Sequence, residues 1–228
     1  MNQTHNKHLK KTGMLKGILF DMDGVLLDSE RLTSEAAVQY FKKKGFNVQP
    51  EDFIPFYGQG ETRYFGGVAE KYEIPFDVEK EKNQVYDLFA EIAEGKMQPL
   101  PGIPEFIDRV KKMNLKTAVA TSASRYKVQV NLKLIGLKES LFDTIITGED
   151  IEKNKPNPEI FIKAATQLGL KPVECLVIED SPGGVEAAIN AGCKCLAIMS
   201  SFSKDELVKA DWIINDLSDF PTEIFAKL

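Results

Sequence analysis

The stretch GILFDMDGV, residues 17–25, joins a short apolar run to two aspartates and a glycine. The run at 17–20 predicts a strand buried on both faces, as in a parallel sheet. Asp21 and Asp23 follow where the strand ends, and Gly24 lets the backbone turn. Two carboxylates this close are costly unless a positive group lies between them. The stretch therefore indicates a buried first strand with a cation-binding end.

The rest of the chain repeats this pattern of buried strand and helix. Short apolar runs recur at residues 117–120, 144–147, 176–178 and 196–199. Between them, helical periodicity marks residues 104–113, 125–135, 158–168 and 183–191. The alternation predicts an α/β fold, a doubly wound (Rossmann-like) parallel sheet that binds ligands at the carboxyl ends of its strands.

One interval interrupts the alternation. Residues 29–99 contain no clear buried strand, and apolar residues such as Leu32, Ala36 and Tyr40 recur at helical spacing. We expect a small all-helical cap domain at 29–99, inserted after the first strand as a lid. The predicted core is formed by residues 14–28 and 100–228, and residues 1–13 are a polar leader.

Composition bounds the function. Of 228 residues, 43% are hydrophobic, and 29 Lys and Arg face 34 Asp and Glu, for a formal net charge of -5. This is a globular composition without the basic stripe that nucleic-acid binding needs. No stretch is typical of a signal peptide or a transmembrane span. We expect a cytoplasmic protein with no nucleic-acid or membrane partner and no evident obligate protein partner.

The rarest residues exclude several chemistries. The two histidines, His5 and His8, both lie in the leader, which disfavours catalysis or zinc binding through imidazole. The three cysteines, Cys175, Cys193 and Cys195, form no disulfide framework and are expected to be reduced core residues. Carboxylates, lysines and hydroxyls remain as candidates.

Acids also follow the run at 176–178, as Glu179 and Asp180. Alone, a pair of aspartates most often caps a loop and a lysine such as Lys155 is most often solvated. If the two acidic strand ends are adjacent, four carboxylates converge with Lys155 as the only evident cation, and the excess negative charge requires a divalent ion. Oxygen ligands favour Mg²⁺.

Hydroxyls follow the run at 117–120, where Thr121 and Ser122 precede a predicted helix. Their hydroxyls and the amides of the helix N-terminus suit a phosphate group.

Together these residues resemble the four motifs of the haloacid dehalogenase superfamily of phosphotransferases. The motifs are DMDGV at 21–25, Thr121, Lys155 within KPNP, and Glu179 with Asp180. The resemblance spans nearly the whole chain after the leader. The helical insertion resembles the phosphoglycolate phosphatase and β-phosphoglucomutase branch, and residues 53–74, which include GQGE at 58–61, look like the cap of CbbY-type phosphatases.

The resemblance implies catalytic roles. Asp21 would attack phosphorus to give an aspartyl phosphate, and Asp23 would be the general acid and then the base that activates water. Thr121 and the Ser122 amide would bind phosphate oxygens, and Lys155 would balance charge on Asp21 and the phosphoryl group.

The resemblance also implies a magnesium site. Its ligands would be Asp21, the backbone carbonyl of Asp23, Asp180, and Glu179 directly or through water.

Two departures from the mutase pattern favour a phosphatase. Thr33 stands where β-phosphoglucomutase-like sequences carry a cap histidine, and the cap arginine for a distal phosphate is replaced by Glu61, with Arg63 two residues later. Arg63 is a candidate for a second phosphate or sugar hydroxyls, and pairing with Glu61 or Glu70 is as plausible. We expect a phosphatase acting on a small phosphorylated metabolite.

Two alternatives stay open. The first is a phosphomutase with β-phosphoglucomutase-like activity. The second is a signalling receiver domain that uses phospho-aspartate as its message. A receiver carries that aspartate on a later strand and has no helical insertion, which disfavours it here.

Overall fold

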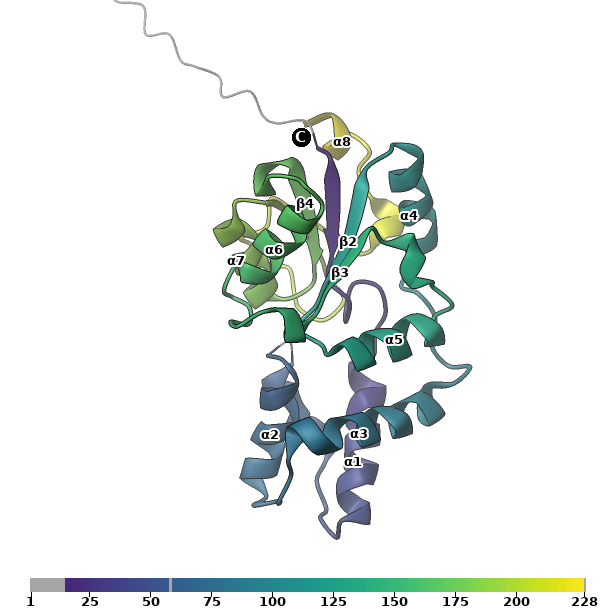
Figure 1. Cartoon of the computed structure of the whole chain (residues 1–228), viewed down its shortest axis with the longest axis vertical. Coiled ribbons are helices and arrows are strands. Elements are labelled where there is room, and N and C mark those ends of the chain that lie inside the picture. The colour runs from purple at the N-terminus through teal and green to yellow at the C-terminus, as the bar shows by residue number, and fades with distance from the viewer. Residues whose placement is uncertain (1–14, 58, 228) are drawn as a thin grey trace, which may run out of the picture.

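The computed structural model describes residues 15–57 and 59–227, and it contains one sheet of six parallel strands (Figure 1). The strand order is β3-β2-β1-β4-β5-β6. The strands are β1 (Gly17–Phe20), β2 (Lys116–Ala120), β3 (Thr144–Ile146), β4 (Cys175–Glu179), β5 (Lys194–Ile198) and β6 (Trp212–Ile214). The predicted doubly wound fold is confirmed. The sequence prediction missed β6, a three-residue edge strand that is only half-buried and therefore lacks the strong apolar signal of the others.

Helices cover both faces of the sheet. They are α4 (Ile103–Lys112), α5 (Arg125–Leu134), α6 (Glu159–Gln167), α7 (Pro182–Ala191) and the short α8 (Ile224–Lys227). Alternate residues of β1 face opposite sides, as a pleated strand requires. Ile18 and Phe20 lie in the core that includes α4 and α5, and Leu19 lies in the core with α6 and α7. The central strand is thus buried on both faces.

The segment between β1 and α4 is helical. It contains α1 (Glu30–Lys43), the 3₁₀ helix η1 (Pro50–Phe56), α2 (Glu61–Lys71) and α3 (Val78–Ala93). In Figure 1 these helices lie beyond the carboxyl ends of the strands, next to α5. Aromatic side chains hold them together. The rings of Phe41 and Phe76 are 5.1 Å apart, and those of Phe65 and Tyr86 are 5.7 Å apart.

Some sequence features lie outside the described residues, namely the leader at 1–13, with His5 and His8, and Gly58 of the GQGE segment. Among the described helices, none has the length and apolar character needed to cross a bilayer.

The cysteines are core residues, as the sequence predicts. Cys175, Cys193 and Cys195 are buried and unbridged. Burial raises the pKa of Cys175 and of Cys193 to about 12, so these thiols stay protonated and unreactive.

Candidate active site

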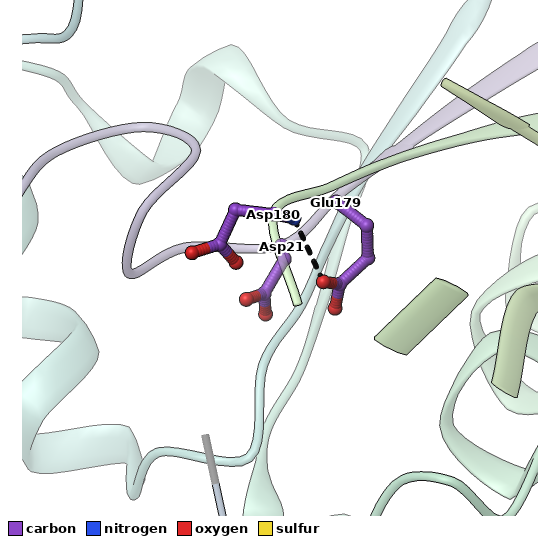
Figure 2. A group of neighbouring side chains, drawn as sticks. All are labelled: Asp21, Glu179 and Asp180. Carbon is purple, nitrogen blue, oxygen red and sulfur yellow. Dashed lines mark hydrogen bonds between the residues drawn. The ribbon is translucent and has the colours of Figure 1, made fainter. Parts of the chain in front are cut away.

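Three carboxylates meet where β1 and β4 end side by side. Phe20 pairs with Ile178 in the sheet, and the Asp21 backbone N–H donates to the Ile178 carbonyl at 3.0 Å. This register places Asp21 beside Glu179 and Asp180. Figure 2 shows the three side chains converging, with one oxygen of each within 4.8 Å of the others. All three are largely buried.

Close packing orients Glu179 and Asp180. A Cβ at Gly184 would lie 1.8 Å from Oε1 of Glu179, and a Cβ at Gly24 would lie 1.9 Å from Oδ2 of Asp180. Gly24 also has a φ of +79°, which side chains rarely tolerate. Oε2 of Glu179 accepts bonds from the N–H of Asp180 at 2.8 Å and of Ser181 at 2.9 Å. These carboxylates are therefore held in place by the backbone around them.

Lys155 joins this group as a buried cation. Its Nζ lies 2.8 Å from Oδ1 of Asp21 and 2.6 Å from Oε1 of Glu179. Burial alone would lower the pKa of Lys155, but the two carboxylates raise it above its usual value. The lysine is therefore charged at neutral pH.

One lysine does not balance three buried acids. Burial raises the pKa of Asp21 to about 7, against the opposing effect of Lys155. Burial, with Glu179 and Asp21 nearby, raises the pKa of Asp180 well above its usual value. Burial and the neighbouring acids, only partly offset by Lys155, therefore disfavour three ionised carboxylates at this point. An all-oxygen donor set short of positive charge fits a divalent ion such as Mg²⁺.

The Asp23 carboxylate is not part of this close group and instead contacts two residues of α5. It lies 2.9 Å from Nζ of Lys127, and it accepts hydrogen bonds from Ser29 and, at 3.1 Å, from Nδ2 of Asn131. The expectation that Lys155 is the only cation near these acids is wrong. The chain reverses after Asp23 and brings its side chain against α5, where Lys127 provides a second buried charge.

Lys127 and Asn131 are polar residues that the sequence reasoning missed. They lie one turn apart on α5, with 6% and 0% of their surface exposed. A signal was present, since both fall in the helix's buried stripe beside Val128 and Leu132. Buried charged residues are rare unless they are paired. Lys127 is paired with Asp23. Burial lowers the pKa of Lys127, but Asp23 and then Glu30 outweigh it, so that the pKa is raised.

The loop after β2 offers hydroxyls and amides opposite Asp21. Thr121 is buried and its Oγ1 accepts from the Ala123 N–H at 3.2 Å. Oγ of Ser122 is buried and has no hydrogen-bond partner among the described residues. Both residues line one pocket with Asp21 and Lys155. An unpaired buried hydroxyl in a pocket calls for a polar ligand.

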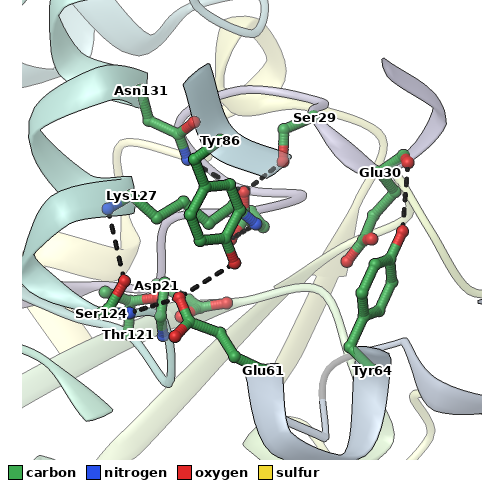
Figure 3. A network of polar contacts seen from close by, with 12 residues as sticks. Asp21, Ser29, Glu30, Glu61, Tyr64, Tyr86, Thr121, Ser124, Lys127 and Asn131 are labelled. Atoms are coloured by element: carbon green, nitrogen blue, oxygen red, sulfur yellow. Dashed lines mark hydrogen bonds and ion pairs between the residues drawn. The ribbon is translucent and has the colours of Figure 1, made fainter. Parts of the chain in front are cut away.

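The helical segment closes the other side of this pocket through Glu61. Its Oε1 accepts from the Ser124 backbone N–H at 2.8 Å and from the Tyr86 hydroxyl at 2.9 Å, as Figure 3 shows. Its Oε2 lies 3.2 Å from Nζ of Lys82. Glu61 begins α2 and Ser124 caps α5, so this contact joins the helical segment to the part of the chain that forms the sheet.

Arg63 lies outside the pocket. Half of its side chain is exposed; its NH1 lies 3.6 Å from Oε2 of Glu70, and its guanidinium stacks 5.4 Å from the Phe56 ring. Of the two partners that the sequence suggested, the structure shows Glu70.

The pocket thus brings together residues from both parts of the chain. From the sheet side come Asp21, Asp23, Thr121, Ser122, Ala123, Lys127, Lys155, Asp180, Ser181, Ser201 and Phe202. From the helical segment come Glu30, Thr33, Phe56, Tyr57, Gly60, Glu61, Tyr64 and Tyr86. It is the candidate active site.

Comparison with known proteins identifies the family. The family model for haloacid dehalogenase-like hydrolases matches residues 18–198. The chain is a member of this family. This membership sets aside the receiver-domain alternative.

Relatives and solved structures agree with the assignment. Hexitol phosphatase A of Escherichia coli is 30% identical over 89% of this chain and 91% of its own length. SUPPRESSOR OF QUENCHING 1 of Arabidopsis thaliana is 40% identical over 84% of this chain, which spans only 18% of that longer protein. The crystal structure of CbbY from Rhodobacter sphaeroides in complex with phosphate has a TM-score of 0.85 and 24% identity, covering 94% of this chain and 100% of CbbY. This haloacid dehalogenase-like hydrolase is therefore similar to proteins that are named as phosphatases.

Proposed function

We propose that this enzyme is a Mg²⁺-dependent phosphatase that hydrolyses a small phosphorylated metabolite, such as a sugar phosphate, through an aspartyl phosphate. The observation that carries the proposal is the position of Asp21. Its carboxylate belongs to the acidic group and contacts Lys155, and Asp21 lines one pocket with Thr121 and Ser122. A nucleophile, a cation site and an anion-binding loop then meet at one point.

In the proposed reaction, an oxygen of Asp21 bonds to phosphorus while the ester P–O bond breaks, and the alcohol leaves. Water then attacks the same phosphorus and restores Asp21 with release of phosphate. The metal ligands would be Asp21, Glu179, Asp180 and the backbone carbonyl of Asp23. A bound Mg²⁺ offsets the repulsion between a carboxylate and a phosphate dianion.

The remaining groups would support both steps. Asp23 would take up a proton on Oδ1, donate it to the leaving oxygen and later accept one from the attacking water, while Oδ2 keeps its contact with Lys127. Thr121 and Ser122 would hold the phosphate oxygens, and the unpartnered Ser122 hydroxyl supports this role. Lys155 would hold Asp21 in position and balance charge.

We further propose that residues 29–99 act as a cap that excludes water and bulky substrates. Glu61, which contacts Ser124 across the pocket, supports this role. The reduced cysteines are in keeping with a cytoplasmic location. Small phosphorylated metabolites are the proposed partners, rather than nucleic acids or membranes.

The test measures phosphate release from a panel of phosphorylated metabolites with Mg²⁺. Asp21→Asn should abolish turnover, whereas Asp108→Asn, at an exposed position of α4, should leave it intact. Unchanged activity in Asp21→Asn would overturn the proposal. An assay with β-glucose 1-phosphate and a trace of bisphosphate distinguishes a phosphatase from a mutase. A phosphatase yields free phosphate, whereas a mutase yields glucose 6-phosphate.

A further inference from the structure

The helical side of the pocket has unusual chemistry for a site that binds phosphate esters. It contributes two carboxylates, those of Glu30 and Glu61, the hydroxyl of Thr33, and aromatic rings. It contributes no lysine or arginine among the described lining residues. Since the phosphate binds at the sheet side in the proposed reaction, this wall would contact the rest of the substrate.

Thr33 provides an unused polar group on this wall. Its Oγ1 is buried, with the residue only 1% exposed, and it has no hydrogen-bond partner within the described residues. An unpaired buried hydroxyl is destabilising, because it has lost its hydrogen bonds to water. A substrate hydroxyl that reached Thr33 would remove that destabilisation.

Glu30 lies beside Thr33, three residues earlier on the same face of α1. Its carboxylate forms no salt bridge within the described part of the chain; the Tyr64 hydroxyl lies 3.5 Å from its backbone oxygen (Figure 3). Burial raises the pKa of Glu30 to about 7, despite the lowering effect of Lys127. A hydrogen bond with the Tyr64 side chain also lowers this pKa, and the remaining lone pairs of the carboxyl oxygens can accept from a ligand.

The cations near the pocket are already committed to carboxylates. Lys155 pairs with Asp21 and Glu179, Lys127 with Asp23, and Lys82 with Glu61. Arg63 and Arg125 pair with Glu70 and Glu139 on the outside. A second phosphate on the substrate would face Glu30 and Glu61 without an uncommitted cation, which is costly in a confined site.

We propose that Glu30, Thr33 and Glu61 form a leaving-group subsite that accepts an uncharged, hydroxyl-bearing group and rejects a second phosphate or a carboxylate. The inference rests on the proposed phosphatase function. The carboxylates accept hydrogen bonds from substrate hydroxyls, and Thr33 donates or accepts one. The enzyme is therefore selective for monophosphates with a neutral leaving group.

The experiment uses pairs of compounds that differ in one charged group. Glycerol 3-phosphate is compared with 3-phosphoglycerate, and fructose 6-phosphate with fructose 1,6-bisphosphate. Each is tested for kcat/KM and as a competitor of 4-nitrophenyl phosphate hydrolysis. We expect kcat/KM to be higher by about 10-fold or more for the member of each pair that lacks the second acidic group. This is the size of effect expected from a like-charge contact in a partly buried site.

Variants assign the selectivity to residues. Glu30→Gln and Glu61→Gln should each reduce the preference by roughly 3- to 10-fold. Thr33→Val should raise KM for the hydroxyl-bearing compounds and leave kcat nearly unchanged. The control is Glu35→Gln on the same helix, where the carboxylate pairs with Arg31 at the surface, and it should leave the preference unchanged.

Two results would overturn the subsite. One is a kcat/KM for the acidic member of each pair that equals or exceeds that for the other member. Equal competition by both members against 4-nitrophenyl phosphate, or none by either, would also overturn it. The other is an unchanged preference in Glu30→Gln, a variant that loses no salt bridge. These results differ from failure of the proposed function, which would appear as 4-nitrophenyl phosphate hydrolysis that does not depend on Asp21.

Discussion

Nζ of Lys127 lies 2.9 Å from Oδ2 of Asp23. This ion pair connects α5, which follows the second strand, to the loop that follows the first. Asn131 and Ser29 complete the contacts of the carboxylate. The proposed acid and base group is therefore positioned by α5 and by the loop that leads to α1.

Removing Lys127 should destabilise the fold. Lys127→Met leaves the partly buried Asp23 without a counter-charge, and breaking a buried pair typically costs about 3 kcal/mol or more. Urea unfolding should therefore show a free energy of unfolding lower by about 3 kcal/mol. Lys133→Met, at an exposed position on the same helix, is the control. In the double variant with Asp23→Asn the loss should be smaller than the sum of the single losses; additive losses would contradict the coupling.

Two adjacent glycines of α7 should respond differently to alanine. At Gly184 a Cβ would lie 1.8 Å from Oε1 of Glu179, whereas at Gly183 nothing lies within 4 Å. Gly184→Ala should displace Glu179 and lower both activity and Mg²⁺ affinity by about 10-fold or more, as changes around metal ligands do. Gly183→Ala should be neutral or stabilise by up to about 1 kcal/mol. Titration with Mg²⁺ and thermal unfolding measure these effects, and equal responses would count against the packing argument.

Metal removal should abolish activity and lower thermal stability. Three buried carboxylates with one lysine repel one another when no divalent ion is bound. Treatment with EDTA should stop phosphate release, and added Mg²⁺ should restore it. At 100 times its dissociation constant, Mg²⁺ should add about 2.7 kcal/mol to stability. Asp180→Asn should weaken this stabilisation. A melting temperature independent of Mg²⁺ in the wild type would be inconsistent with the site.

Acid should weaken the helical segment through Asp52. Although burial opposes them, bonds from Lys71, Tyr72 and the Gln49 amide lower the pKa of Asp52. A folded-state pKa below the unfolded value of about 4 means that Asp52 stabilises the fold above about pH 4, and this stability is lost as pH falls through the folded pKa.

The corresponding measurement is urea unfolding between pH 3 and pH 7. Asp52→Asn should lower stability at pH 7 and flatten the acid decline. Asp205→Asn, at an exposed position, serves as the comparison and should keep the wild-type profile. A decline that is identical in Asp52→Asn and wild type would exclude this contribution.

The strands show how far the pattern of residues predicts the fold. Residues 17–20 were predicted as a strand and form β1, and the four later apolar runs correspond to β2 through β5 with ends shifted by at most two residues. Their continuous apolar character reports burial on both faces. β6 escaped prediction because an edge strand of three half-buried residues needs little apolar sequence.

The site also contains residues whose meeting could be predicted from the sequence and others whose contacts could not. The acids after β1 and β4 could be expected to meet, because parallel strands carry their carboxyl ends to one edge. Lys127 could not be paired with Asp23 from the sequence, because the two residues are 104 positions apart and the contact depends on how α5 packs. The contact of Glu61 with Ser124 likewise depends on the position of the helical segment.

The amino-acid sequence by itself determined the doubly wound sheet and the acidic strand ends. The apolar runs, and the acids that follow them, are local features of the chain. The tertiary structure alone decided that Asp23 binds Lys127, that Arg63 points outward to Glu70, and that Glu30, Thr33 and Glu61 face the pocket. These contacts depend on the packing of helices distant in sequence, and helical periodicity cannot specify which partner a polar side chain meets.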